Sequence, residues 1–366
     1  MTKVGVIGAN GQVGAELCLI LARRPDIELV AICRNRSGSA FLRWRGIACR
    51  HGRVADSTDA ARLIADCDVI VNSSLATGNP AEIRHTEDLI VHNLFTHSKD
   101  SATIVHFSTQ SVYGDPRPNR LYRRQNPYGR VKLASERKVR AEQRLSRKPA
   151  YILRLGHVCG AMQGISNSIR DSIRARSVVL PTEDCSSNTV YTAAIIGAIL
   201  QIIRGAVPVG TYDLMNSPRW TWREVYEYEA KACRVEFEPI VAPDRPHRSA
   251  LAMLRGFIMS VVAVLMSAKP LVEFGTKLFV HVPDRVNARA MAWWLSRRAR
   301  REIAALTHTP SPPEHLTWVA NGVNFFPADQ PTRELLNALE ADSAANVEAK
   351  PWPADLPDAR TDGVRG

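Results

Sequence analysis

The chain has 366 residues, and its 45% apolar and 23% charged residues are typical of a globular protein rather than a disordered or fibrous one. The formal net charge of +12 suits an anionic small molecule, a nucleic acid or an acidic membrane surface. Because the arginines are spread along the chain without interleaved aromatic residues, we favour a solvated basic surface and predict no nucleic-acid partner.

Strand-like apolar runs alternate with helical segments as far as Leu155. The predicted strands are Val4–Ile7, Glu28–Cys33, Gly46–Ala55, Asp68–Asn72, Thr103–Phe107 and Ala150–Leu155. The predicted helices between them are Gln12–Arg24, Thr58–Ala65, Pro80–Ser98 and Tyr128–Ser146. This alternation predicts an α/β fold with a doubly wound parallel sheet.

After Gly156 the alternation loosens. We expect helices at Asn167–Arg176, Thr192–Arg204 and Trp220–Cys233, and one more sheet strand at Gly210–Met215. In the last helix Thr221 is followed three residues later by Glu224, a capping-box pattern.

Gly256–Ala268 is uncharged and apolar, but a bilayer span needs about 20 residues. We therefore favour a buried or partner-facing helix over contact with a membrane. From about Asp329 the chain is rich in Ala, Asp, Pro and Glu, and its end is expected to be disordered.

The seven cysteines are isolated and form no CxxC motif. This pattern argues against a zinc site and favours a reducing compartment, so we predict no metal and a cytoplasmic location. Met1 leads almost directly into the first apolar run, which leaves no room for a signal peptide.

A glycine turn joins the first predicted strand to the first helix. Gly8, Gly11 and Gly14 stand at spacing three and three in the stretch KVGVIGANGQVGAEL. Gly8 allows the tight turn, Gly11 lets a pyrophosphate approach the backbone, and Gly14 lets the helix pack closely on the strand. The helix N-terminus offers free N–H groups to that pyrophosphate. This context favours a phosphate-binding motif over a turn that binds nothing.

Tyr128 and Lys132 stand one helical turn apart on one face of a predicted helix. A neighbouring cation favours the phenolate and lowers the pKa of a tyrosine, which is ordinarily about 10. The pair therefore suits proton exchange in a carbinol/carbonyl interconversion. Thr109, at the carboxyl end of the fifth predicted strand, could hydrogen-bond the same substrate oxygen, because ligands bind at that edge of such sheets.

Four stretches resemble the extended short-chain dehydrogenase/reductase family of nucleotide-sugar epimerases and dehydratases. They are GANGQVG, HFSTQSVYG, NPYGRVK followed by LASE, and YILRLGHVCG. The likeness covers Lys3 to Gly160 and continues more faintly through Gly210 to Glu224. It implies a Rossmann-type NAD(P)-dependent enzyme and, by analogy, a homodimer built on helices Pro80–Ser98 and Tyr128–Ser146.

By this resemblance Tyr128 is the catalytic acid/base, Lys132 binds the nicotinamide ribose and lowers the tyrosine pKa, and Thr109 orients the substrate oxygen. The implied cofactor-binding residues are Gly8, Asn10, Gly11, Gln12, Val13, Gly14, Arg34, Asp56, Ser73, Ser74, Lys132 and His157. Among them the glycines line the pyrophosphate, Asp56 meets the adenine, and the two serines lie by the cofactor after the fourth strand.

The sequence departs from the family at two cofactor positions. Arg34 stands at the end of the second strand, where NAD-preferring members carry an acidic residue. An acid would bond the ribose 2′-hydroxyl, whereas an arginine favours a 2′-phosphate, so we predict NADP, with NAD as second choice. The alternative is that Arg34 points to solvent. His157 stands where the family usually has an asparagine.

Our substrate prediction is a nucleotide-activated sugar that is reduced or epimerised. Dehydration is less favoured, because Gln110 and Ser111 follow Thr109 where dehydratases of the family carry acidic residues. Cys185–Ala194 lacks the Arg and Asp of sugar-nucleotide epimerases, although Arg219 or Arg255 could replace the cation. The alternatives are a hydroxysteroid- or lipid-type dehydrogenase of the same family and a non-catalytic cofactor-binding scaffold or sensor.

We divide the chain accordingly into an NAD(P)-binding domain and a smaller, mostly helical substrate lobe in its C-terminal half. The first comprises residues 1–160, with 188–216 returning to the sheet. The second comprises residues 161–187 and 217–330, and residues 331–366 form a tail.

Overall fold

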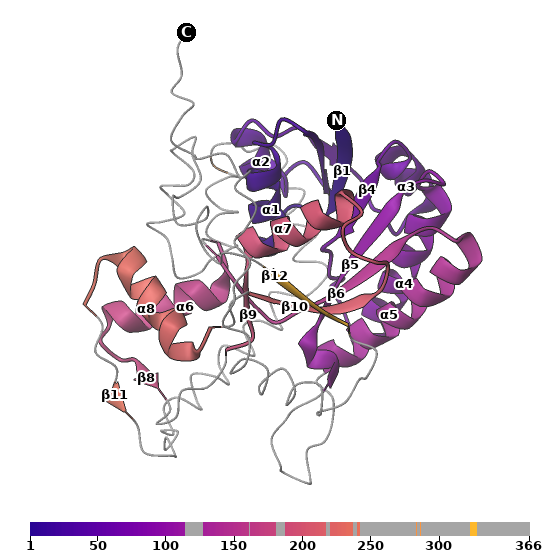
Figure 1. Ribbon diagram of the computed structural model, residues 1–366. Helices are drawn as coiled ribbons and strands as arrows, with labels where there is room; N and C mark the ends of the chain where they lie inside the picture. The colour runs from indigo at the N-terminus through magenta and orange to yellow at the C-terminus, as the bar shows by residue number, and fades with distance from the viewer. Residues whose placement is uncertain are drawn as a thin grey trace.

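An eight-stranded sheet runs through the middle of the molecule (Figure 1). The computed structural model describes residues 1–113, 127–160, 162–180, 187–216, 220–236, 240–241, 283, 286 and 323–327. The sheet strands are β1 (Thr2–Ile7), β2 (Ile27–Cys33), β3 (Cys49–His51), β4 (Val69–Asn72), β5 (Thr103–Thr109), β6 (Ala150–Leu155), β10 (Thr211–Asn216) and β12 (Val323–Pro327). Their order is β12-β10-β6-β5-β4-β1-β2-β3, and only β12 is antiparallel to its neighbour.

The strand order reverses at β1, which lies between β2 and β4. The chain builds outward from β1 through β2 and β3, and then continues from β4 on the other side of β1. In open α/β sheets, ligands bind outside the carboxyl ends of the strands at such a reversal. The ends of β1 and β4 therefore mark where a ligand is expected.

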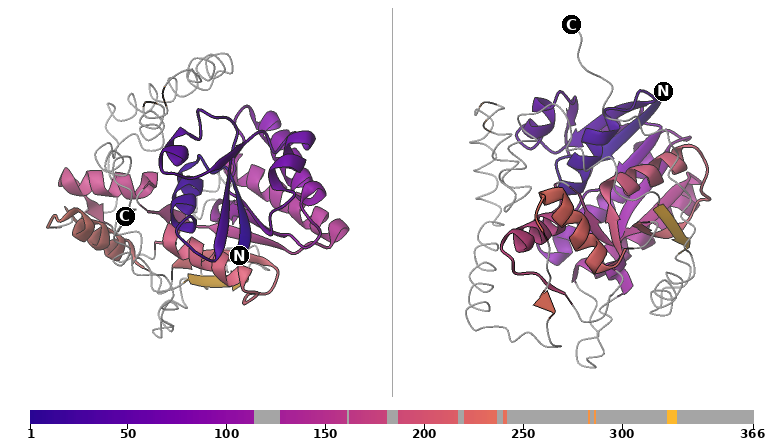
Figure 2. Two further views of the ribbon diagram at one scale, coloured as in Figure 1. Left: turned by 90° about the horizontal axis from the view of Figure 1, so that it is seen from above. Right: turned by 60° about the vertical axis from the view of Figure 1, so that its left-hand side comes forward.

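Helices cover both faces of the sheet (Figures 1 and 2). One face carries α1 (Gln12–Leu21), α2 (Ala40–Trp44) and α7 (Thr192–Ile203), and the other carries α3 (Ser57–Ile64), α4 (Pro80–His97) and α5 (Pro127–Ser146). Two apolar cores result, because alternate strand residues such as Val4 and Val6 point to one face while Ile7 and Ile70 point to the other.

A smaller helical unit lies beside the sheet (Figure 1). It contains α6 (Gly164–Arg174), α8 (Trp222–Cys233), β8 (Val179–Leu180) and β11 (Ile240–Val241), and the short strands β7 (His157–Cys159) and β9 (Thr189–Tyr191) connect it to the sheet. Inside it Arg170 Nε donates to Glu229 Oε2 at 2.5 Å, and both side chains are buried. This ion pair joins α6 to α8.

The α/β Rossmann-type fold expected from the sequence is confirmed. The predicted strand Ala150–Leu155 has the bounds of β6, and the expected capping box forms at the start of α8, where Thr221 Oγ1 accepts from the Glu224 N–H and the Glu224 carboxylate accepts from the Thr221 N–H. The strand expected at Gly46–Ala55 is shorter, because a turn closed by the Asp56 N–H and the Arg53 carbonyl follows β3.

Several predicted features lie outside the described residues. They are the apolar segment Gly256–Ala268, the candidate cations Arg219 and Arg255, and the tail after residue 330. Among the helices that the structure describes, none has both the length and the apolar character needed to cross a membrane.

Candidate functional site

The glycine turn follows β1 as the sequence predicts. Gly8 has φ +76, in the left-handed region that favours glycine, and the Gly11 N–H donates to its carbonyl at 2.8 Å. A Cβ placed on Gly14 would lie 2.3 Å from the Gly8 oxygen and 2.9 Å from Ser73 Oγ, so the first turn of α1 rests directly on the loop. Gly11 caps α1 without a side-chain hydrogen bond, which leaves the first N–H groups of the helix available to an anion.

Ser73 and Ser74 follow β4 and lie against this turn. Ser73 Oγ donates to the Ile7 carbonyl at 2.7 Å, and Ser74 Oγ donates to Asn72 Oδ1 at 2.6 Å. A Cβ on Gly8 would lie 2.9 Å from the backbone of Ser74. The glycine turn and the two serines are thus held together at the reversal of the sheet.

Lys132 connects α5 to the same place. Its side chain is buried, and its ammonium donates to the Ser74 carbonyl at 3.1 Å. The Nζ also lies 3.7 Å from Oε2 of Glu87, a buried residue of α4 that the sequence analysis did not identify. The positive charge of Lys132 is therefore partly balanced by the negative charge of the Glu87 carboxylate.

Thr109 is the last residue of β5, and the start of α5 packs against the loop that follows it. The Ser111 N–H donates to Thr109 Oγ1 at 3.2 Å. A Cβ on Gly129 would lie 2.3 Å from the Ser111 oxygen, so only glycine allows this close approach. The approach brings the helix end that carries Tyr128 beside the carboxyl end of β5.

The expected lowering of the Tyr128 pKa is wrong for this structure. Tyr128 is 38% exposed, yet desolvation by the atoms around its phenol, and then the negative charge of Glu87, raise its pKa above the usual value. The spacing on α5 places Tyr128 and Lys132 one turn apart, but it contains no information about the carboxylate that α4 contributes.

A buried charge cluster fixes α5 to the strands beneath it. Glu136 on α5 accepts from Arg154 Nε at 2.9 Å and from Arg154 Nη2 at 2.7 Å. Its Oε1 also accepts from Ser108 Oγ at 2.6 Å, and Ser108 directly precedes Thr109. Helix α5, which carries Tyr128 and Lys132, is thus tied to β5 and β6.

The adenosine side of the expected cofactor site is formed by separate loops. Arg34 follows β2 with an exposed side chain, and its pKa is lowered by desolvation from neighbouring atoms and then by the positive charge of Arg53. Asp56 is the N-cap of α3, where its Oδ1 accepts from the Asp59 N–H at 2.9 Å. Asn10 lies beneath the loop after Arg34, because a Cβ on Gly38 would be 2.8 Å from its Nδ2. The first turn of α3 therefore already uses one oxygen of the Asp56 carboxylate.

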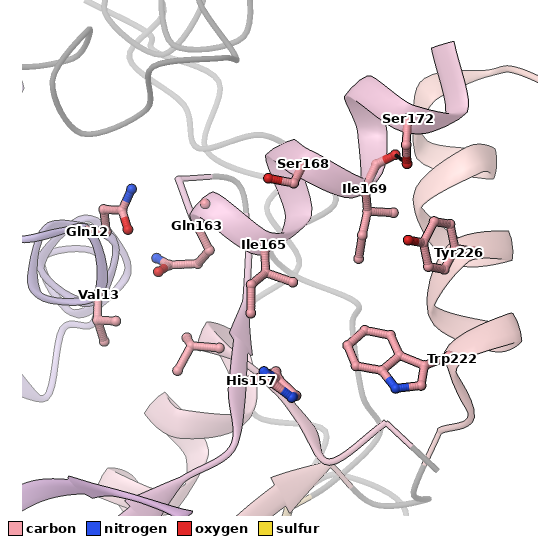
Figure 3. A pocket seen from close by; sticks show the side chains of 12 residues that line it. Gln12, Val13, His157, Gln163, Ile165, Ser168, Ile169, Ser172, Trp222 and Tyr226 are labelled. Carbon is pink, nitrogen blue, oxygen red and sulfur yellow. Dashed lines mark hydrogen bonds between the residues drawn. The ribbon is translucent and has the colours of Figure 1, made fainter. Parts of the chain in front are cut away.

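A cavity of about 820 Å³ opens between α1, β7, α6 and α8 (Figure 3). Gln12 and Val13 line it from α1, Ile169 from α6, and Trp222 and Tyr226 from α8. His157 lines it as well: its side chain is exposed, its ring centroid lies 5.4 Å from that of Trp222, and desolvation by the surrounding atoms lowers its pKa. Of the described residues, Thr109, Tyr128 and Lys132 do not line this cavity.

His106 is a second buried polar residue that the sequence analysis missed, since TIVHF looks like a plain apolar strand. Asn72 Nδ2 lies 3.2 Å from its Nδ1, and Ser135 Oγ lies 3.2 Å from its Nε2. Asn72 Oδ1 accepts from Ser74, so the amide nitrogen must donate, and Nδ1 of a neutral imidazole accepts. Burial and the charge of Lys132 hold the pKa of His106 well below its usual range.

This neutral imidazole predicts acid sensitivity. The unfolded chain takes up a proton at His106 near pH 6.5 and the folded chain does not, so stability is present above that pH and falls below it by about 1.4 kcal/mol per pH unit. We expect His106→Gln to lose less stability than the wild type in urea unfolding between pH 7.5 and 5. Equal losses in the two proteins would contradict this account of His106.

The sequence is similar to a known protein family and to several characterised proteins. Residues 4–183 match the model of a family described as the NAD dependent epimerase/dehydratase family. The spore coat polysaccharide biosynthesis protein SpsK of Bacillus subtilis is 25% identical over 240 residues, covering 61% of this chain and 77% of that protein. N-acetyl-gamma-glutamyl-phosphate reductase of Desulforamulus reducens is 36% identical over 74 residues, covering 19% of this chain and 21% of its own length. This chain thus spans about a fifth of that reductase.

Solved structures share the fold. UDP-N-acetylglucosamine 4-epimerase from Bacillus cereus aligns with a TM-score of 0.52 and 16% identity, over 69% of this chain and 89% of that one. UDP-glucose 4-epimerase from Thermus thermophilus, solved with NAD, aligns with a TM-score of 0.50 and 19% identity, over 70% and 93%. At such identities the likeness concerns the arrangement of helices and strands.

Proposed function

We propose that this protein reduces or epimerises a carbinol/carbonyl of a nucleotide-activated sugar. The chain belongs to the NAD dependent epimerase/dehydratase family, and it is an NAD(P)-dependent enzyme of the extended short-chain dehydrogenase/reductase type. The observation that carries the proposal is the convergence at one sheet edge of the glycine turn, Ser74, the Lys132 ammonium and the Thr109 loop.

The glycine turn fits a dinucleotide. The close packing of α1 on the Gly8 turn, which a Cβ at Gly14 would prevent, is what a dinucleotide-binding turn requires, and N–H groups without a side-chain cap suit a pyrophosphate. Gly8, Gly11 and Gly14, with Asn10, Gln12 and Val13, would hold the phosphates, and Ser73, Ser74, Lys132 and His157 would lie along the nicotinamide half. When bound, this cofactor supplies the hydride chemistry.

Tyr128 has the role of acid and base in this proposal. As a phenol it donates its proton to a carbonyl oxygen, and as a phenolate it accepts the proton of a hydroxyl. Thr109 Oγ1 hydrogen-bonds the same oxygen, and Lys132 holds the ribose through its ammonium. Three side chains from β5 and α5 then surround one reacting bond.

The nucleotide-sugar substrate is supported by the named relatives, which include UDP-sugar epimerases and a polysaccharide biosynthesis protein. We also propose a homodimer through α4 and α5, a cytoplasmic location, and the division into a cofactor domain and a substrate lobe described above. A panel of UDP-sugars incubated with NADPH or NADP, with product analysis by mass spectrometry, tests the substrate class directly.

A second candidate function rests on the cavity beside α6 and α8. Its described lining residues include Ile165, Ile169, Trp222 and Tyr226 and contain no Lys, Arg, Asp or Glu. Gln12, Gln163, Ser168 and Ser172 add polar groups to the lining. A lining that mixes apolar and neutral polar groups without a cation favours a hydroxysteroid or another lipid alcohol over a diphosphate. Quenching of protein fluorescence by a steroid but not by UDP would favour this second candidate.

We propose NADP as the cofactor, with Arg34 reading the 2′-phosphate and Asp56 placed near the adenine. Loss of a charge-assisted hydrogen bond costs about 1.5–3 kcal/mol, so Arg34→Asp is expected to weaken NADPH binding by about ten- to a hundredfold and to favour NADH. Titration of cofactor fluorescence against the wild type and the variant measures both affinities.

Arg84→Asp is the matched control for this prediction, because it makes the same charge change at an exposed position on α4. It should leave the preference for NADPH unchanged. Equal binding of NADPH and NADH by the wild type would remove Arg34 as a phosphate reader, and failure to bind either would contradict the proposed function itself.

A further inference from the structure

Glu87 is a buried carboxylate in the middle of α4. It is 1% exposed, and its helix neighbours Ile90, Val91 and Leu94 belong to an apolar core. A carboxylate buried in such surroundings is costly unless it is paired and hydrogen-bonded. Position 87 therefore requires an explanation beyond the packing of α4.

The two oxygens of Glu87 have different surroundings. Oε1 accepts from the Ala76 N–H at 2.8 Å, in the loop after Ser74. Oε2 accepts no hydrogen bond from the described residues and lies 3.7 Å from Lys132 Nζ. The carboxylate thus faces the ammonium that we place at the cofactor ribose, without closing a direct hydrogen bond to it.

The charged and titratable groups around this pair come from three elements. Helix α4 contributes Glu87, helix α5 contributes Lys132 and Tyr128, and strand β5 contributes His106, which is held neutral. The positive charge of Lys132 alone would favour the phenolate form of Tyr128. Because Glu87 Oε2 lies only 3.7 Å from Lys132 Nζ, the electrostatic effects of the two opposite charges largely cancel at groups farther from the pair.

We propose that Glu87 is a positioning residue of the candidate site: its carboxylate holds the Lys132 ammonium against Ser74 and offsets its charge, so that Tyr128 remains a phenol at neutral pH. This inference rests on the proposed function for the role of Tyr128 as proton donor. A phenol gives a proton to a carbonyl oxygen, whereas a phenolate takes one from a hydroxyl. Glu87 thereby favours reduction over oxidation at neutral pH.

The raised pKa of Tyr128, to which the charge of Glu87 contributes, agrees with this arrangement. The site differs from a simple Tyr–Lys pair in having a third ionisable side chain. That side chain comes from a helix whose first residue is more than forty positions before Tyr128 in the sequence.

The test is a titration of Tyr128 itself, which needs neither cofactor nor substrate. Protein labelled with ¹³Cζ-tyrosine gives a phenol-to-phenolate shift in NMR spectra, and Tyr128→Phe identifies the signal. Glu87→Gln keeps an acceptor for the Ala76 N–H but removes the charge. We expect its Tyr128 midpoint to lie about one pH unit below that of the wild type. Asp88→Asn, the same change at the next residue of α4, should leave the midpoint in place.

Two further variants distinguish the loss of charge in Glu87→Gln from a folding defect. Glu87→Asp keeps the charge and should return the midpoint toward the wild-type value. Glu87→Gln with Lys132→Met removes both charges and should also give a midpoint near that of the wild type, because the net local charge is again zero. A folded Glu87→Gln with an unchanged midpoint, or an equal shift in Asp88→Asn, would overturn the inference.

NADPH titration of the same samples separates this inference from the proposed function. A lowered Tyr128 midpoint together with NADPH binding supports both. A lowered midpoint in a protein that binds neither NADPH nor NADH would retain the electrostatic role of Glu87 and contradict the proposed reaction.

Discussion

Tyr128→Phe is expected to lower kcat by about 10²–10⁴-fold, the usual contribution of a general acid or base. Phenylalanine fills the same space but has no proton to give or accept, so the substrate oxygen would have to exchange its proton with water. The change removes no group that we assign to the cofactor, and NADPH affinity should stay within about a factor of three. Steady-state kinetics on the substrate that the UDP-sugar panel identifies, with a fluorescence titration of NADPH, measures both quantities.

Tyr212→Phe is the matched control for this prediction. Its hydroxyl donates to the Pro208 carbonyl at 2.6 Å at the amino end of β10, whereas the candidate site lies at the carboxyl ends of the strands, so it should leave kcat unchanged. The wild-type pH profile adds a second check. Because the pKa of Tyr128 is raised, the rate of alcohol oxidation should climb toward alkaline pH, while the rate of carbonyl reduction stays level through neutral pH. A Tyr128→Phe enzyme within tenfold of wild type would remove Tyr128 from the reaction.

The fold was predictable because the central strands of the parallel sheet are buried on both faces and are mostly apolar in sequence. Val69–Asn72 and Ala150–Leu155 are such mostly apolar runs, and both form strands of the central sheet. The two-residue strands β8 and β11 were not predicted, because their pairing depends on partners about sixty positions away rather than on a local pattern.

The candidate site was predictable where one stretch carries both the residue and its context. The glycine turn, with Gly14 close to the Gly8 oxygen, is such a case. Glu87 was not predictable, because nothing in PAEIRHTEDLIVHNLFTH separates it from the other polar residues of an amphipathic helix. Only the packing of α4 on α5 brings it to Lys132, where its negative charge adds to desolvation in raising the pKa of Tyr128.

The charge cluster between α5 and strands β5 and β6 was also not predicted from the sequence. Arg154 sits in YILRL, which looks like an apolar strand, and Glu136 sits in a helix rich in Lys and Arg, which looks solvated. Both side chains are buried, at 2% and 0% exposed, and they pair with each other. An arginine within an apolar strand run is therefore a signal worth testing against acidic residues on the helix that precedes it.

Glu136→Gln is expected to destabilise the protein by about 3–5 kcal/mol, because it removes the negative charge of a buried ion pair whose other member, Arg154, keeps its positive charge. Urea unfolding measures the loss. Since Glu136 also accepts from Ser108, next to Thr109, and lies on the helix of Lys132, we expect NADPH binding to weaken as well. Arg140→Ala is the matched control: Arg140 contacts the same carboxylate at 3.0 Å but is one-third exposed, and its loss should cost less than about 1 kcal/mol.

The combination of Glu136→Gln with Arg154→Met separates the loss of the ion pair from a general packing defect. The introduced glutamine retains an acceptor for Ser108 Oγ, and the methionine removes the charge while filling much of the volume of the arginine. If the penalty comes from the loss of this ion pair, the double variant should regain at least half of the lost stability, as replaced buried ion pairs generally do. If it is no more stable than Glu136→Gln alone, the ion pair is not what holds α5 to β6, and the placement of Tyr128 and Lys132 must rest on the apolar contacts of the helix and on Gly129.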